Sequence, residues 1–152
     1  MQHTGSDRLV FVNLPVTDVA ASRAFFARLG FAFDERFSDE DDACVVVSPA
    51  ISLMLLARAR FADFAPRPVG DPSRQTSVLV ALSRESREAV DAFMTAGVAA
   101  GGADNNHTQE HGGWMYGRSI SDPDGNVIEV LWMDAARAST TFPGEMDAAV
   151  DA

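Results

Sequence analysis

One carboxylate, Glu129, stands in an otherwise apolar row near the end of the chain, and it is the residue best placed to do chemistry. The run from Gly112 to Asp134 that contains it predicts a β-hairpin. Its turn is Asp122-Pro123-Asp124-Gly125, in which proline presets φ, aspartate bonds its own backbone and glycine accepts a positive φ. Glu129 is therefore our candidate catalytic residue.

The register of this hairpin would follow from the length of its turn. A four-residue loop would pair Ser121 with Asn126 and, counting outward, set Arg118 opposite Glu129. A charged pair of this kind is either part of a ligand site or a cross-strand ion pair that closes the sheet surface. An Arg118 partner would make Glu129 a fixed recognition charge, whereas an unpaired Glu129 in an apolar cavity could act as a general base. Side chains alternate along a strand, so one face would carry Trp114, Tyr116, Arg118, Val127, Glu129, Leu131 and Met133.

Composition restricts the class of protein. The chain has 152 residues, enough for one domain with a sizeable core, and no apolar run approaches the length of a membrane span. Its net charge of −10 repels phosphate backbones and anionic lipids, which argues against nucleic-acid and membrane partners. The N-terminal MQHTGSDR lacks the features of a secretory signal, and the single cysteine, Cys44, lies among valines. We therefore expect an inert thiol and a cytoplasmic protein.

The elements that must position Glu129 form two similar halves, each reading β-α-β-β-β. In the first half, Asp18 is expected to cap a helix that ends at Gly30. In the second half, Ser83 is expected to cap a helix that ends at Gly97. The expected strands are Arg8–Val16, Phe31–Phe37, Ala43–Ser48 and Ile51–Ala57, then Ser77–Leu82, Val98–Ala103, Trp114–Ser121 and Asn126–Trp132.

This repeat predicts an α+β fold of two βαβββ modules that share one sheet system. The expected divisions are an N-terminal segment 1–7, a first module 8–59, a connector 60–76, a second module 77–134 and a tail 135–152 that is frayed or lightly docked.

Two histidines lie in the segment Asp104–Gly113, which we expect to be a loop. The segment is rich in glycine and asparagine, and it could form a mobile lid over a cleft. His107 and His111 are spaced for chelation only if the loop were helical, and they could otherwise be solvent-exposed or line a cavity rim. The role of this pair stays open.

Two segments carry a resemblance to a known family. FVNLPVTDVAASRAFFARLGF in the first half and MYGRSISDPDGNVIEVLWMD in the second are similar to motifs of the vicinal oxygen chelate superfamily. That superfamily holds glyoxalase I, extradiol dioxygenases, and fosfomycin- and bleomycin-resistance proteins. The resemblance covers about residues 8–134. It implies two βαβββ modules whose mixed sheets curl around a cleft, often completed by a homodimer.

The resemblance also implies where a metal would bind. Metal-dependent members take their ligands from the first and last strands of both modules, and Glu129 matches the last of these. Phe11 and Leu79 stand where a histidine or another ligand is usual, and the fourth position is Ser52, Met54 or Leu56, depending on register. Phenylalanine and leucine cannot donate to a cation, and one glutamate alone does not hold it against water. We therefore expect no metal and no other cofactor, and a bound divalent ion is the disfavoured alternative.

The expected function is binding of a small molecule in an apolar cleft without the family's metal. The alternative is a metal-dependent glyoxalase-like lyase or dioxygenase with relocated ligands, so whether the chain is an enzyme stays open. A third class, a structural interaction protein, would follow if the cleft were filled by its own side chains. Trp132 would face the core. The expected ligand-binding residues are Phe11, Asn13, Met54, Leu79, Trp114, Tyr116 and Arg118.

Overall fold

The computed structural model describes residues 8–137, and its first half forms a complete βαβββ module. Asp18 caps the helix as predicted, because its side chain accepts a hydrogen bond from the Ala21 amide at 3.0 Å. The predicted strand Phe31–Phe37 is only two residues long and continues as a 3₁₀ turn. The elements are β1 (Val10–Val16), α1 (Val19–Arg28), β2 (Ala32–Phe33), η2 (Glu35–Phe37), β3 (Asp42–Ser48) and β4 (Ile51–Ala57). They build a mixed sheet in the order β1-β4-β3-β2, with β1 parallel to β4.

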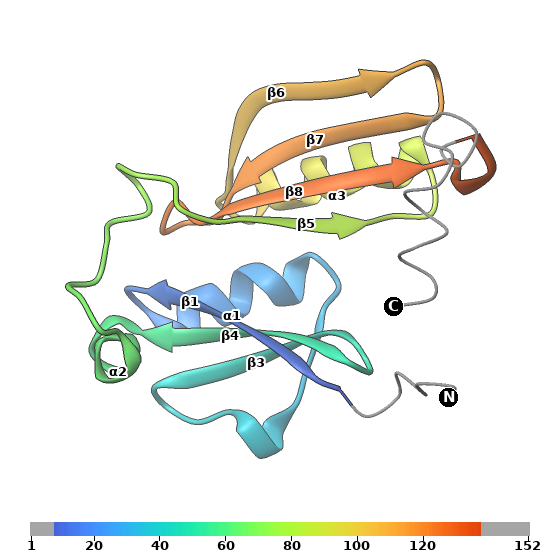
Figure 1. Ribbon diagram of the computed structural model, residues 1–152. Coiled ribbons are helices and arrows are strands. Elements are labelled where there is room, and N and C mark those ends of the chain that lie inside the picture. Colours follow the sequence, from blue (N-terminus) through green and yellow to red (C-terminus); the bar gives the residue numbers. More distant parts are fainter. Residues whose placement is uncertain (1–7, 138–152) are drawn as a thin grey trace.

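The second half repeats this topology in a sheet of its own (Figure 1). Its elements are β5 (Leu79–Ser83), α3 (Arg87–Ala99), β6 (Ala103–His111), β7 (Met115–Ser121) and β8 (Val127–Met133). The order is β5-β8-β7-β6, with β5 parallel to β8. The α+β fold of two βαβββ modules is therefore confirmed, but each module has a separate four-stranded sheet. The connector contains a helix that was not predicted, α2 (Arg58–Phe64). The predicted segment 1–7, with His3, and residues 138–152 of the predicted tail lie outside the described residues.

The helix of the second module was misplaced in the sequence prediction. Ser83 is the last residue of β5, and Ser86 is the N-cap, accepting a hydrogen bond from the Ala89 amide at 3.0 Å. Gly97 does not end the helix. It is buried inside α3 and packs so closely on β7 that an added Cβ would lie 2.4 Å from the Ile120 side chain. The helix instead stops before Gly101, whose φ of +105° breaks the helical path.

The predicted strand Val98–Ala103 and the predicted loop Asp104–Gly113 are both wrong. Residues 103–111 form β6, the outer strand of the second sheet, paired with β7. Its sequence is polar throughout, which hid the strand from a search for apolar alternation. Asn106, with a φ of +54°, lies where the β6–β7 register shifts between Asp104 and Thr108.

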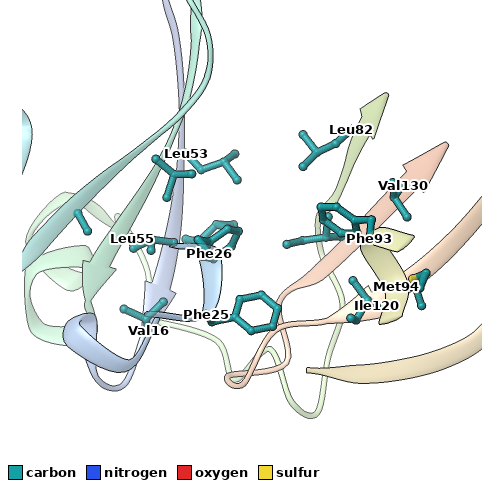
Figure 2. Close-up of a cluster of buried hydrophobic side chains, with 14 of the residues drawn as sticks. Val16, Phe25, Phe26, Leu53, Leu55, Leu82, Phe93, Met94, Ile120 and Val130 are labelled. Carbon is teal, nitrogen blue, oxygen red and sulfur yellow. The ribbon is translucent and has the colours of Figure 1, made fainter. Parts of the chain in front are cut away.

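A single apolar core joins the two modules. Helices α1 and α3 lie behind the sheets of their modules in the view of Figure 1. Both sheets therefore turn the face that these helices leave uncovered, here called the open face, to the same side. Figure 2 shows Phe25 and Phe26 of α1 pointing toward Phe93 of α3 and Ile120 of β7, and all four are buried. Trp132 packs against this core, which confirms its predicted side of β8.

Polar contacts also cross between the modules at the turn 122–126. Asp124 Oδ1 accepts hydrogen bonds from the Thr17 amide at 2.8 Å and from the Thr17 hydroxyl at 2.6 Å. The Asn126 side chain donates to the Pro15 carbonyl at 3.1 Å. The hairpin turn therefore fixes the end of β1, the strand that carries Phe11 and Asn13, against the second module.

Candidate functional site

The turn of the last hairpin is one residue longer than predicted, and this moves every residue of β7. Asp122 Oδ1 accepts from the amides of Asp124 at 2.9 Å and Asn126 at 2.8 Å, while Oδ2 accepts from the Asn126 side chain at 3.0 Å. Asn126 is thus part of the turn, and Ser121 pairs with Val127. Burial raises the pKa of the Asp122 carboxyl, which its hydrogen bonds from Asn126 partly oppose.

The predicted pairing of Arg118 with Glu129 is therefore wrong. Ser119 lies opposite Glu129, and Arg118 lies opposite Val130 on the other face of the sheet. A shift of one residue in a strand transfers each side chain to the opposite face. Contrary to the prediction, Tyr116 and Arg118 therefore do not share a face with Glu129. The prediction that they line the cleft rested on that shared face and loses its basis.

Tyr116 and Arg118 instead fasten α3 to the sheet. The Tyr116 hydroxyl donates to Asp91 Oδ1 at 2.6 Å, and Arg118 donates to the same oxygen at 3.1 Å. Arg118 also donates to Asp104 Oδ2 at 2.6 Å. The pKa of the Asp91 carboxyl is lowered, chiefly by the Tyr116 hydrogen bond and then by Arg118. Trp114 lies in the turn before β7, where its ring stacks on His111 with centroids 5.9 Å apart.

Glu129 lies on the open face of the second sheet beside an ordered polar cluster. Ser121 donates to Asn105 Oδ1 at 2.9 Å, and Asn105 donates to the Ser119 hydroxyl oxygen at 2.8 Å. Ser119 is 5% exposed and is the cross-strand neighbour of Glu129. Within residues 8–137, the Glu129 carboxylate has neither a hydrogen-bond donor nor an ion-pair partner. A fixed neutral cluster thus lies beside an acid that is available to a ligand.

A polar hollow of about 440 Å³ covers this cluster. Its floor includes Leu79, His107, Ser119 and Glu129 from the open face, and its wall is the connector segment 72–76, which includes Arg74. The volume lies within the range typical of small-molecule sites. The surroundings of Glu129 are more polar than the apolar row predicted from the sequence.

An apolar hollow of about 500 Å³ lies on the open face of the first sheet. Phe11, Asn13 and Leu56 form one side, and Phe61 and Phe64 of α2 form the other. Phe11 keeps 44% of its surface exposed, and Leu79 in the polar hollow keeps 55%, so these side chains do not close the cleft.

A third hollow of about 180 Å³ connects the other two. It shares Asn13 and Phe61 with the apolar hollow, and Pro72, Gln75 and Val127 with the polar one. Because neighbouring hollows share lining residues, the three lie in a row from the first sheet to the second, here called the cleft, with Asn13 lining both the apolar and the connecting hollow.

The strand ladders show which residue of the first module corresponds to Glu129. In the first module Asn13, two residues after Phe11, pairs with Met54. In the second module Ala81, two residues after Leu79, pairs with Glu129. Met54 is therefore the counterpart of Glu129, on the same face as Asn13. The four positions that the resemblance assigns to metal ligands hold Phe11, Met54, Leu79 and Glu129. This donor set does not fit a divalent ion, and residues 8–137 contain no group of three or more histidine, cysteine or acidic residues arranged to hold one.

The structure thus brings together part of the predicted site and adds residues that sequence reasoning missed. Phe11, Asn13, Leu79 and Glu129 line the cleft, and Met54 lies beside Asn13. The missed residues are Arg74 of the connector and Asn105 of β6, while His107, whose role the sequence left open, lines the polar hollow. Residues 104–111 are all polar, so no alternation along the chain marked the face on which Asn105 and His107 lie.

Comparisons with known proteins agree with this architecture. Residues 8–48 match the family model described as bleomycin resistance protein-like N-terminal. No curated protein matches the chain.

Among solved structures, a glyoxalase/bleomycin resistance protein/dioxygenase family enzyme from Burkholderia phytofirmans PsJN is 21% identical, with a TM-score of 0.68, over 83% of this chain and 98% of its own. A glyoxalase-related enzyme from Fulvimarina pelagi is 20% identical, with a TM-score of 0.70, and the match covers 83% of this chain and 88% of that enzyme. A lactoylglutathione lyase from Agrobacterium tumefaciens is 19% identical, with a TM-score of 0.60, over 83% and 93%. The family match and the shared fold confirm the resemblance to the vicinal oxygen chelate superfamily.

Proposed function

We propose that this chain, which has the fold of the vicinal oxygen chelate superfamily, binds a small organic molecule in the cleft between its two modules and does so without a metal. The observation that carries the proposal is the row of three adjoining hollows, apolar at Phe11 and Phe64 and polar at Glu129. An apolar surface supplies affinity, and a few fixed polar groups supply orientation, as small-molecule sites generally require.

A screen of ligands against a blocked variant tests this proposal. Asn13 lines both the apolar and the connecting hollow, so Asn13→Trp would place a large ring across the junction. In a thermal-shift screen of diverse small organic molecules, we expect some compounds to raise the Tm of the wild type and not that of Asn13→Trp. Ala92→Trp, exposed on α3, is the matched control and should keep these shifts. If no compound stabilises the wild type, or if Asn13→Trp keeps every shift, the proposed binding cleft is wrong.

The proposal includes a homodimer and a cytoplasmic location. Leu9, Val10, Phe37 and Ile51 are between 40% and 59% exposed around the start of β1. Val10 pairs with Ile51 on the face of the sheet opposite to Phe11, whereas Phe37 packs edge-on against Phe11, so Phe11 and Phe37 form one apolar surface. A second copy of the chain would bury it. Cys44 is a buried free thiol, which fits a reducing compartment. Among the described helices, none is long and apolar enough to cross a membrane.

The alternative is a metal-dependent lyase or dioxygenase with relocated ligands, and one observation favours it. His107 of β6 lines the same hollow as Glu129, so an imidazole and a carboxylate face a common space. Together they are two donors where a catalytic ion usually has three from the protein. The hydroxyl of Ser119 and the amide of Asn105 already bond each other.

Native mass spectrometry with elemental analysis distinguishes these alternatives and reads the oligomeric state at the same time. After expression with added nickel, zinc, manganese and iron, we expect a dimer mass with no stoichiometric metal. One ion per chain, lost in Glu129→Ala or His107→Ala and retained in the exposed control Glu85→Ala, would establish the metal enzyme instead. A monomer mass at micromolar concentration would contradict the dimer.

A further inference from the structure

Two opposite charges face the polar hollow without partners. Arg74 comes from the connector and Glu129 from β8. In the described part of the chain, neither the Arg74 guanidinium nor the Glu129 carboxylate takes part in a side-chain hydrogen bond or an ion pair, with each other or with another residue. The nearby Asp71 accepts two hydrogen bonds from Ser73, at 2.9 and 2.6 Å, and its pKa is lowered chiefly by these bonds and also by the charge of Arg74, which acts on it at a distance without a direct ion pair.

The remaining polar groups of the hollow cannot neutralise these charges. Asn105, Ser119 and Ser121 are neutral and bond one another. His107 contacts only the Gln109 amide, at 3.5 Å. A ligand that covers the hollow would remove water from both Arg74 and Glu129, and an unpaired charge is costly to desolvate. A ligand with only one charge would pair with one of them and leave the other uncompensated.

We propose that the ligand is a zwitterion with an apolar substituent. Its cationic group would lie against Glu129 and its anionic group against Arg74. The apolar substituent would extend into the connecting hollow, which is lined by Leu14, Phe61 and Val78. This inference rests on the proposed binding function and adds the chemical class of the ligand.

Three probes with the same benzyl group test the pairing of charges. L-Phenylalanine carries both charges, phenethylamine only the cation and 3-phenylpropionate only the anion. Calorimetric titration of the wild type should show the tightest binding for L-phenylalanine, at least about tenfold tighter than for either single-charge probe. Glu129→Gln should abolish the advantage of L-phenylalanine over 3-phenylpropionate, and Arg74→Gln should abolish its advantage over phenethylamine.

Matched controls remove the same charges elsewhere. Glu85→Gln and Arg28→Gln lie on exposed positions outside the cleft and should leave all three affinities unchanged. The zwitterion is wrong if L-phenylalanine binds no tighter than both single-charge probes, or if its advantage survives both cleft variants. A different result refutes the proposed binding function: a diverse screen in which no compound stabilises the wild type and loses this effect in Asn13→Trp. Compounds that Asn13→Trp excludes, combined with no advantage of L-phenylalanine over the single-charge probes, would therefore refute the zwitterion and leave the binding function standing.

Discussion

Replacing Gly125 with alanine is expected to lower the free energy of unfolding by about 3 kcal/mol or more. A Cβ at this position would lie 2.6 Å from Ser73 Cα, 2.7 Å from Ser73 N and 2.8 Å from Pro72 C. These are backbone atoms, so no side-chain rotation relieves the clash. The φ of +96° at Gly125 adds strain for any residue with a Cβ. Chemical denaturation of the purified variant measures the loss.

Gly101→Ala is the matched control for this substitution. Gly101 has a similar φ of +105°, but an added Cβ there would meet nothing within 4 Å. We expect this control to lose about 1 kcal/mol from backbone strain alone. Equal losses in the two variants would show that the contact of Gly125 with the connector contributes nothing. The contact matters for function because residues 72–76 are the wall of the polar hollow.

Truncating Phe26 to alanine is expected to cost about 3–5 kcal/mol, the range for removing a buried aromatic ring. Phe26 is 0% exposed and packs edge-on against Phe25 and Phe31, with centroids 5.2 and 5.9 Å apart. Phe31 in turn packs against Phe93 of the second module. Because the core spans both modules, unfolding should stay a single transition that moves to lower temperature, as calorimetry would show.

Phe64→Ala is the control for the loss of a ring. Phe64 is 64% exposed on α2, so its truncation should change stability by less than about 1 kcal/mol. Two separate transitions in Phe26→Ala, one for each module, would contradict a shared core. An unchanged Tm would contradict the burial of Phe26.

The sequence was sufficient for elements with strong local signals. Asp18, the apolar spacing of α1 and the Asp-Pro-Asp-Gly turn each predicted the structure at their position, and the repeat predicted the two modules. The apolar strands β4 and β8 were placed to within a residue, since each is a short and nearly continuous apolar run that follows a turn containing proline. β6 was missed because its side chains are polar on both faces and only the pairing with β7 makes it a strand.

The largest error in the predicted site came from the length of the last turn. The residues of the turn predict a bend, but they do not show whether Asn126 belongs to the turn or to the following strand. Three hydrogen bonds to the Asp122 carboxylate, two of them from Asn126, make Asn126 part of the turn. That single residue moved Tyr116 and Arg118 to the face of α3 and left Glu129 unpaired. Arg74 could not have been found at all, because only the contact of the connector with Gly125 brings it to the cleft.

The separation of the two sheets has a consequence for synthesis on the ribosome. Every strand pair lies within one module, so the first can complete its ladder as soon as Ala57 has left the exit tunnel. The hydrogen bonds between Thr17 and Asp124, 107 residues apart, must wait for nearly the whole chain. Until then, Phe25 and Phe26 lack the covering that Phe93 and Ile120 later provide. The nascent first module is thus the stage at which this protein is most exposed to aggregation, since transiently exposed apolar surface promotes it.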